Sequence, residues 1–213
     1  MTARTRSRLL ARSSLLGRFG LLAPLAALSL AGCGINSIPT AEENVNAKWA
    51  NVQSEYQRRN DLIGNLVETV KGFAAQEKGV LVAVTEARSR ATSTQLSAAD
   101  LDDPAKVRAF NDAQSQLSSS LNVLRGPTIF EAYPELKSNE NFLTLQSQIE
   151  GTENSILVSR NDYNEAVRGY NTRIRTFPDA IGAKIFYGAK PKVPFEAAAG
   201  ADKAPQVNFN TAG

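Results

Sequence analysis

Apolar residues recur every seven positions between residues 45 and 91. Two such series run together: Val45, Val52, Arg59, Leu66, Phe73, Val80 and Ala87, and four residues further on Trp49, Tyr56, Ile63, Val70, Glu77, Val84 and Ala91. The repeat predicts a long amphipathic helix over about residues 41–97, packed in the seam of a helical bundle. Thr40 and Glu43 have the spacing of a capping box at its start. Gly64 predicts a bend or break inside it, because glycine is a poor helix former.

A shorter helix is predicted next. Asp103 before Pro104 is typical of a helix start, since Asp is a good N-cap and proline fits the first helical turn. Apolar residues then keep helical spacing until Gly126 and Pro127 end the helix. Residues 127–137 contain two prolines and are predicted to form an irregular connection.

A second long helix is predicted from Ser138 or Asn139 to Phe177, where Pro178 ends it. Its seam is again spaced by seven: Phe142, Ile149, Ile156, Tyr163, Tyr170 and Phe177. A short amphipathic piece follows over residues 180–187, and the Ala/Gly/Pro-rich residues 197–213 are predicted to be disordered. No strand-like alternation is found. The predicted fold class is therefore all-α, an antiparallel bundle of three long or medium helices plus a short C-terminal helix within residues 40–196.

The N-terminus has the pattern of a targeting segment. Residues 1–18 are basic without an acid, and residues 19–31 form an apolar run of 13, shorter than the roughly 20 residues that span a bilayer. The run ends in Leu30-Ala31-Gly32-Cys33, which resembles the lipobox of bacterial lipoproteins. We expect cleavage of residues 1–32 and a covalent lipid on Cys33, with residues 33–39 as a linker. An ordinary signal peptide with a chance cysteine and an uncleaved membrane helix are the alternatives.

The residue after Cys33 bears on location. Position 34 is Gly, whereas Asp at this place retains enteric lipoproteins in the inner membrane. The expected location is the bacterial envelope, on the periplasmic face of the inner or outer membrane, with the outer membrane slightly favoured.

Composition narrows the chemistry. Of 24 basic residues, five arginines lie in residues 1–32, so the rest of the chain, with all 21 acidic residues, is slightly acidic. The pI near 9.1 thus reflects the N-terminus and predicts no nucleic-acid surface. There is no His and a single Cys, which removes the usual ligands of zinc, the commonest general base and any disulfide framework. No metal, cofactor or catalytic residue is predicted, apart from the covalent lipid.

Polar residues interrupt the apolar seams at Arg59, Glu77, Glu153, Arg160 and Asn164. Arg160 lies one turn from Asn164 and two turns from Glu153, so we expect Arg160 to pair with Glu153 or with Glu77, the other inward-facing acid. Such a layer either fixes the register of the helices or lines a pocket for a ligand. No motif predicts a cleft.

Two weaker features lie near the C-terminus of the predicted domain. Residues 168–192 contain six basic residues against Asp179 alone, which is typical either of a surface for anionic lipid or of a solvated helix end. Tyr133, Phe186 and Tyr187 are candidates for an exposed aromatic patch, although we expect them to be buried.

Several blocks of sequence resemble the LemA family. Residues 56–67, YQRRNDLIGNLV, and the VKG of residues 70–72 are similar to its motif Y-x-R-R-x-D-L-I-P-N-L-V-x-x-V-K-G. Blocks at residues 133–146, 150–156 and 160–171 extend the resemblance over about residues 45–190. Gly64 stands where the family usually has Pro, and Gln76 stands where members often have His. The resemblance implies a small helical bundle held outside the cytoplasm by an N-terminal anchor, and it implies no activity.

These observations favour a membrane-anchored envelope lipoprotein whose helical surface binds another, unknown envelope protein. The alternative is a binding protein for a small or lipidic ligand held between the helices. An enzyme is not expected, because no motif brings a nucleophile together with a base. The oligomeric state is not predicted.

Overall fold

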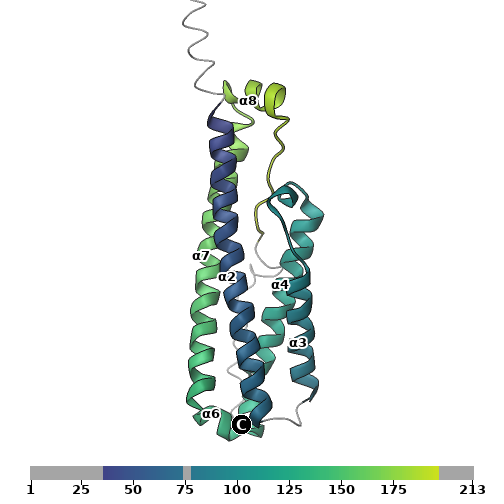
Figure 1. Cartoon of the computed structure of the whole chain (residues 1–213), viewed down its shortest axis with the longest axis vertical. Coiled ribbons are helices and arrows are strands. Elements are labelled where there is room, and N and C mark those ends of the chain that lie inside the picture. Colours follow the sequence, from purple (N-terminus) through teal and green to yellow (C-terminus); the bar gives the residue numbers. More distant parts are fainter. Residues whose placement is uncertain (1–35, 74–77, 197–213) are drawn as a thin grey trace, which may run out of the picture. The chain divides into compact units, whose positions relative to one another are not determined.

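The computed structural model describes residues 36–73 and 78–196. Cys33, Glu77, the predicted signal peptide and the predicted disordered tail lie outside these residues. The described part is built of helices and contains no strand, which confirms the all-α prediction (Figure 1). The chain divides into two compact units. Of the described residues, 45–73, 78–168 and 192–196 form the bundle unit, and residues 36–44 and 169–191 form the terminal unit.

The predicted first helix is two helices, α2 (Ser37–Phe73) and α3 (Lys78–Ser93). Arg88 Nε of α3 donates a hydrogen bond to the Asn60 carbonyl of α2 at 2.9 Å, although the two residues are 28 positions apart. In one straight helix they would be about 42 Å apart. The prediction of a single helix over residues 41–97 is therefore wrong, and α3 runs back along α2.

A bend or break was expected near Gly64, and the break is wrong, because α2 is continuous through this residue. A Cβ at Gly64 would lie 3.0 Å from Nη2 of Arg88. The glycine leaves room for this guanidinium, which reaches across to the α2 backbone.

The predicted start of the next helix is confirmed. In α4 (Pro104–Leu124), the Asp103 side chain accepts hydrogen bonds from the backbone amides of Ala105 and Lys106. The connection after it is not irregular as predicted. It forms two short helices, α5 (Pro127–Ala132) and α6 (Pro134–Ser138), each of which begins with a proline. Proline has no amide hydrogen to lose in the first turn, so it starts these helices instead of disrupting them.

The fourth bundle helix of the described part is α7 (Glu140–Arg173), and ion pairs fix its direction. Lys48 contacts Asp162 at 2.9 Å, and Arg59, further along α2, contacts Glu153, earlier along α7, at 3.2 Å. The two helices are therefore antiparallel. In the bundle unit α2, α3, α4 and α7 alternate in direction, an up-down-up-down arrangement (Figure 1).

The apolar seams predicted from the heptads fill the core of this unit. One buried cluster combines residues of all four bundle helices with α5 and α6: Ile63, Leu66, Val67, Val70, Leu81, Val84, Ala87, Ala91, Leu117, Leu121, Leu124, Ile129, Leu136, Phe142 and Ile149. Beside it, Trp49 packs edge-on against Phe110 and Tyr163, with ring centroids 5.5 and 5.8 Å apart. Phe195 also packs on Trp49, and Val193 donates its amide to the Leu101 carbonyl, so the segment after residue 191 belongs to this core.

The terminal unit contains the start of α2, the end of α7, α8 (Asp179–Gly182) and η2 (Ala183–Tyr187). Helix α2 starts at Ser37, before the predicted capping box. The Thr40 hydroxyl donates to the Asn36 carbonyl at 2.8 Å, so Thr40 does not act as the predicted cap. Gly188 has φ +53°, a left-handed conformation suited to glycine, and it ends η2.

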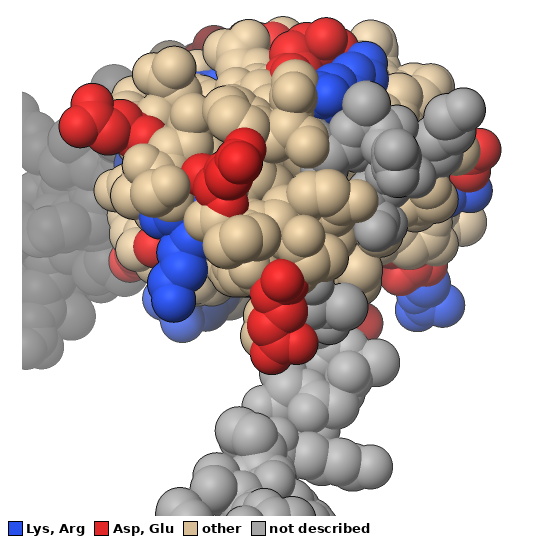
Figure 2. Space-filling model, turned by 90° about the horizontal axis from the view of Figure 1, so that it is seen from below, with Lys and Arg blue, Asp and Glu red and all other residues tan. Residues whose placement is uncertain are grey.

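The surface of the bundle unit at its α6 end is shown in Figure 2. Acidic and basic side chains lie singly or in small groups between uncharged residues on this face. Across residues 36–73 and 78–196, no helix combines the length and apolar character that crossing a bilayer requires.

Candidate functional site

Arg59 of α2 is the most buried charged residue in the described part, with 2% of its surface exposed. Its Nη1 donates to Glu153 of α7 at 3.2 Å and to the Ser118 hydroxyl of α4 at 3.0 Å. Its Nη2 donates to the side-chain oxygen of Gln114. The guanidinium also lies over the Tyr56 ring, 5.0 Å from the centroid. Arg59 thus joins α2, α4 and α7 at one level of the bundle.

This cluster brings together two of the predicted polar residues, Arg59 and Glu153. Glu153 is paired with Arg59. Of the two acids expected as partners of Arg160, Glu153 is therefore wrong, and Glu77 lies outside the described residues. The sequence showed the spacing of Glu153 and Arg160 along one helix, whereas the true partner depends on the register between two helices. The buried Arg59 Nε has no hydrogen-bond partner, so the cluster is not fully satisfied within the described residues.

Arg160 and Asn164 hold the segment that follows the terminal unit. Arg160 donates to the Glu196 carbonyl at 2.9 Å, and its guanidinium lies 4.7 Å from the centroid of the Phe195 ring. Asn164 exchanges two hydrogen bonds with the Phe195 backbone, at 2.8 and 3.0 Å. These two residues therefore anchor a backbone segment, a role that the helical pattern could not reveal because residues 192–196 carry no periodicity.

Two tyrosines beside these clusters have perturbed acidity. Burial raises the pKa of the Tyr163 phenol far above its usual value, and its hydroxyl donates to the Val193 carbonyl at 3.0 Å. Burial also raises the pKa of Tyr56, while the positive charges of Arg160 and Arg59 oppose this shift. Both phenols stay protonated at neutral pH, so neither is available as a base.

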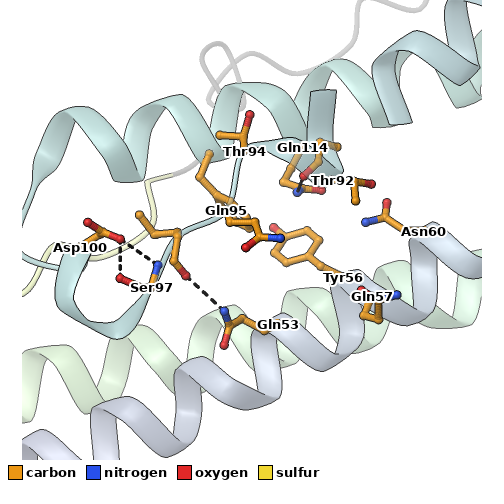
Figure 3. A pocket seen from close by; sticks show the side chains of 13 residues that line it. Gln53, Tyr56, Gln57, Asn60, Thr92, Thr94, Gln95, Ser97, Asp100 and Gln114 are labelled. Carbon is orange, nitrogen blue, oxygen red and sulfur yellow. Dashed lines mark hydrogen bonds between the residues drawn. The ribbon is translucent and has the colours of Figure 1, made fainter. Parts of the chain in front are cut away.

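A groove of about 540 Å³ opens beside the Arg59 cluster, between α2, α3, the short helix η1 (Ala98–Asp100) and α4 (Figure 3). No cleft was predicted from the sequence. The groove depends on the polar stretch at the end of α3 lying opposite α2, which follows only from the reversal between these helices. Uncharged amide and hydroxyl side chains dominate its lining: Gln53, Gln57, Asn60, Thr92, Thr94, Gln95, Ser97 and Gln114.

Asn60 is the most informative residue of the groove. It is 7% exposed, and its buried Oδ1 has no hydrogen-bond partner. A buried polar atom without a partner costs about 1–3 kcal/mol. This oxygen is closed off from solvent, so an occupant of the groove would recover that energy by donating a hydrogen bond once the Asn60 side chain rotates toward the groove. The rings of Tyr56 and Phe110 add an apolar wall to the same groove.

The charged groups at the groove are already engaged. Lys106 and the Ser97 side chain hydrogen-bond to Asp100 and lower the pKa of its carboxyl to about 2. Among the described residues no cluster of three or more His, Cys, Asp or Glu is placed to hold a metal ion. The lining therefore offers neutral donors and acceptors, a chemistry suited to recognition by hydrogen bonds.

The fold and this groove define a class of helical-bundle protein with a polar, hydrogen-bonding groove. The chain belongs to the LemA family, whose pattern it matches over residues 48–209, more than half of its length.

Individual relatives agree with this assignment. The chain is 27% identical over 128 residues to Protein LemA of Metamycoplasma hominis, covering 59% of this chain and 52% of that protein. It is 26% identical over 159 residues to Magnetosome protein MamQ 2 of Paramagnetospirillum magneticum, covering 67% of this chain and 58% of that protein. A MamQ of Magnetospirillum gryphiswaldense is 24% identical over the same length. The chain spans between half and three fifths of the length of these curated relatives.

Proposed function

We propose that this protein is a lipoprotein of a bacterial envelope that binds an extended segment of another envelope protein without catalysing a reaction. Lipid on Cys33 holds it to the membrane, at the periplasmic face of the inner or the outer membrane. The lipobox-like sequence before Cys33 and the membership of the LemA family support the anchor. The unpartnered Asn60 oxygen in the amide-lined groove carries the binding role.

A peptide backbone matches this lining. Side-chain amides carry a donor and an acceptor next to each other, as the peptide group does, so each Gln or Asn can pair with a main-chain amide of an extended segment. Tyr56 and Phe110 provide an apolar surface for one side chain of that segment. A lipid chain fits poorly, because it would remove water from these amides without replacing its hydrogen bonds.

The groove is tested by crosslinking in intact cells. A photo-reactive amino acid at Gln57, which is exposed at the groove, should give a discrete crosslinked protein band. The same group at Asn51, exposed on the opposite side of α2, serves as the control. Asn60→Leu should abolish the crosslink from Gln57, yet it should not lower the melting temperature, because the Oδ1 of Asn60 makes no hydrogen bond within the folded protein.

Equal crosslinking from Gln57 and Asn51, or from Asn60→Leu and the unchanged chain, would contradict the proposal. If the purified protein releases a glycan or a small molecule, and the Asn60→Leu variant carries none, then the ligand of the groove is that polar molecule and not a peptide. Anchoring is read separately by cell fractionation. Cys33→Ser should leave residues 1–32 uncleaved and make the protein far more easily released from the membrane fraction.

A further inference from the structure

The large apolar side chains of residues 177–187 face outward. Phe177 is 82% exposed, Ile185 68% and Phe186 66%, and Ile181 and Tyr187 are also exposed. The burial expected for Phe186 and Tyr187 is therefore wrong. Side chains of this kind normally face the core, and a cluster of exposed ones marks a contact surface. We call these five residues the apolar patch of the terminal unit.

The packing of α8 and η2 explains why the patch points outward. These segments turn their small residues inward, with Gly182 and Ala183 buried. A Cβ at Gly182 would lie 3.8 Å from the Ile38 side chain of α2, so this face is already in contact. Ile181 of α8 and Ile185 of η2 are exposed instead, as is Phe177, which precedes α8.

Basic residues accompany the patch. Arg173, Arg175 and Lys184 are exposed in the same unit. The acid nearest to them in sequence, Asp179, accepts a hydrogen bond from the Ser37 hydroxyl at 2.7 Å. Exposed aromatic and aliphatic side chains together with cations are the combination found where proteins lie on the surface of an anionic bilayer.

The position of the predicted lipid brings the patch close to a membrane. The Ser37–Asp179 hydrogen bond ties the start of α2 to α8. Cys33 precedes Ser37 by four residues, which span at most about 14 Å even when fully extended. A lipid on Cys33 therefore holds the patch within a short distance of the bilayer. This raises the effective concentration of the bilayer surface that the patch encounters.

We propose that the apolar patch of the terminal unit inserts into the headgroup region of an anionic phospholipid bilayer, as a second contact beside the lipid anchor. This inference rests on the anchor proposed above for its short tether. The contact fixes the orientation of the terminal unit on the bilayer. The lipid alone would tether the protein without fixing its orientation.

The chemistry of the chain offers a clean test. Its only cysteine is Cys33, so in the lipidated protein an introduced cysteine is the sole free thiol. Ile185→Cys is labelled with an environment-sensitive dye, and Leu157→Cys, an exposed apolar position on α7, is the matched control. The full-length lipidated protein is reconstituted into vesicles of phosphatidylcholine and phosphatidylglycerol that contain a spin-labelled quencher lipid.

The dye at residue 185 should be quenched about twofold or more, while the dye at residue 157 should be unaffected. The quenching should weaken with Lys184→Glu, with added salt and in vesicles of phosphatidylcholine alone. Lys137→Glu, an exposed charge reversal on α6, should not change it.

Flotation of the same vesicles separates this inference from the anchor. Protein that floats without quenching at residue 185 would overturn the contact and leave the anchor standing. Protein that does not float would overturn the anchor, and quenching at high vesicle concentration would then decide the contact by itself. Energy transfer between dyes on two copies, without vesicles, would show that the patch binds a second copy of the chain and would overturn the membrane contact.

Discussion

Glu153→Leu tests whether the Arg59 cluster is a structural lock. The change removes the one carboxylate that, within the part of the chain the structure describes, contacts a guanidinium that is 2% exposed. Ser118 and Gln114 would remain as neutral partners, and the Arg59 Nε already lacks one. The folded protein would then hold a buried charge without its counter-charge.

The expected loss follows from burial. Removing one partner of a fully buried ion pair costs about 3–5 kcal/mol. Glu153 is 34% exposed and two neutral acceptors remain, so we expect a smaller loss of about 2–3 kcal/mol. For a domain of this size that corresponds to a fall in melting temperature of about 4–12 °C.

Thermal unfolding followed by circular dichroism measures the loss. Glu165→Leu on the same helix is the control, because Glu165 is 77% exposed and its Arg168 partner lies 4.0 Å away. It should change stability by less than about 0.5 kcal/mol. Arg59→Met combined with Glu153→Leu should be less destabilising than the two single losses added together, since no charge is left stranded. Equal melting of Glu153→Leu and Glu165→Leu would refute the reasoning.

Three further outcomes are expected. Tyr163→Phe should lower stability by about 1 kcal/mol by removing the hydrogen bond to Val193, and in the unchanged folded chain this phenol should resist ionisation well above pH 10 in an absorbance titration. Asn164→Ala should remove the side-chain hydrogen bonds that hold the Phe195 backbone, so the Phe195 amide should exchange hydrogen faster. Unchanged exchange would argue that Asn164 does not anchor this segment. The Asp100 carboxyl should titrate near pH 2 by NMR, and Lys106→Ala should return its pKa toward 3.8. Because this pKa is lowered in the folded protein, its contribution to stability is present above about pH 4 and is lost as the pH falls toward 2.

The heptads predicted which residues are buried better than they predicted the path of the chain. Trp49, Ile63, Phe142 and Ile149 are all buried as their spacing required. The reversal between α2 and α3 is not visible in the hydrophobic pattern, because the seven-residue spacing from Phe73 to Val80 continues unbroken across it. A helix that turns back can keep its apolar phase, so periodicity alone does not distinguish one long helix from two.

The polar residues show the same limit. Arg59 and Glu153 were recognised as interruptions of the apolar seam, but their pairing depends on the register between α2 and α7. Arg160 and Asn164 were recognised too, although the backbone groups they bind belong to Phe195 and Glu196, which follow no helical pattern. The groove was missed for the same reason, since it exists only where α3 returns along α2. The turns between helices determine which distant segments come into contact. In this chain the turns have the least regular hydrophobic pattern, so these contacts could not be predicted from the sequence.

The N-terminus of the mature protein decides the central claim, that a lipid on Cys33 holds this bundle to the envelope. The protein is extracted from membranes in detergent, and intact-mass spectrometry is followed by fragmentation of its N-terminal peptide. The account predicts loss of residues 1–32 and a mass increase on Cys33 that corresponds to diacylglycerol, with or without an amide-linked acyl chain. A chain that retains residues 1–32 with a free thiol at Cys33 would contradict it.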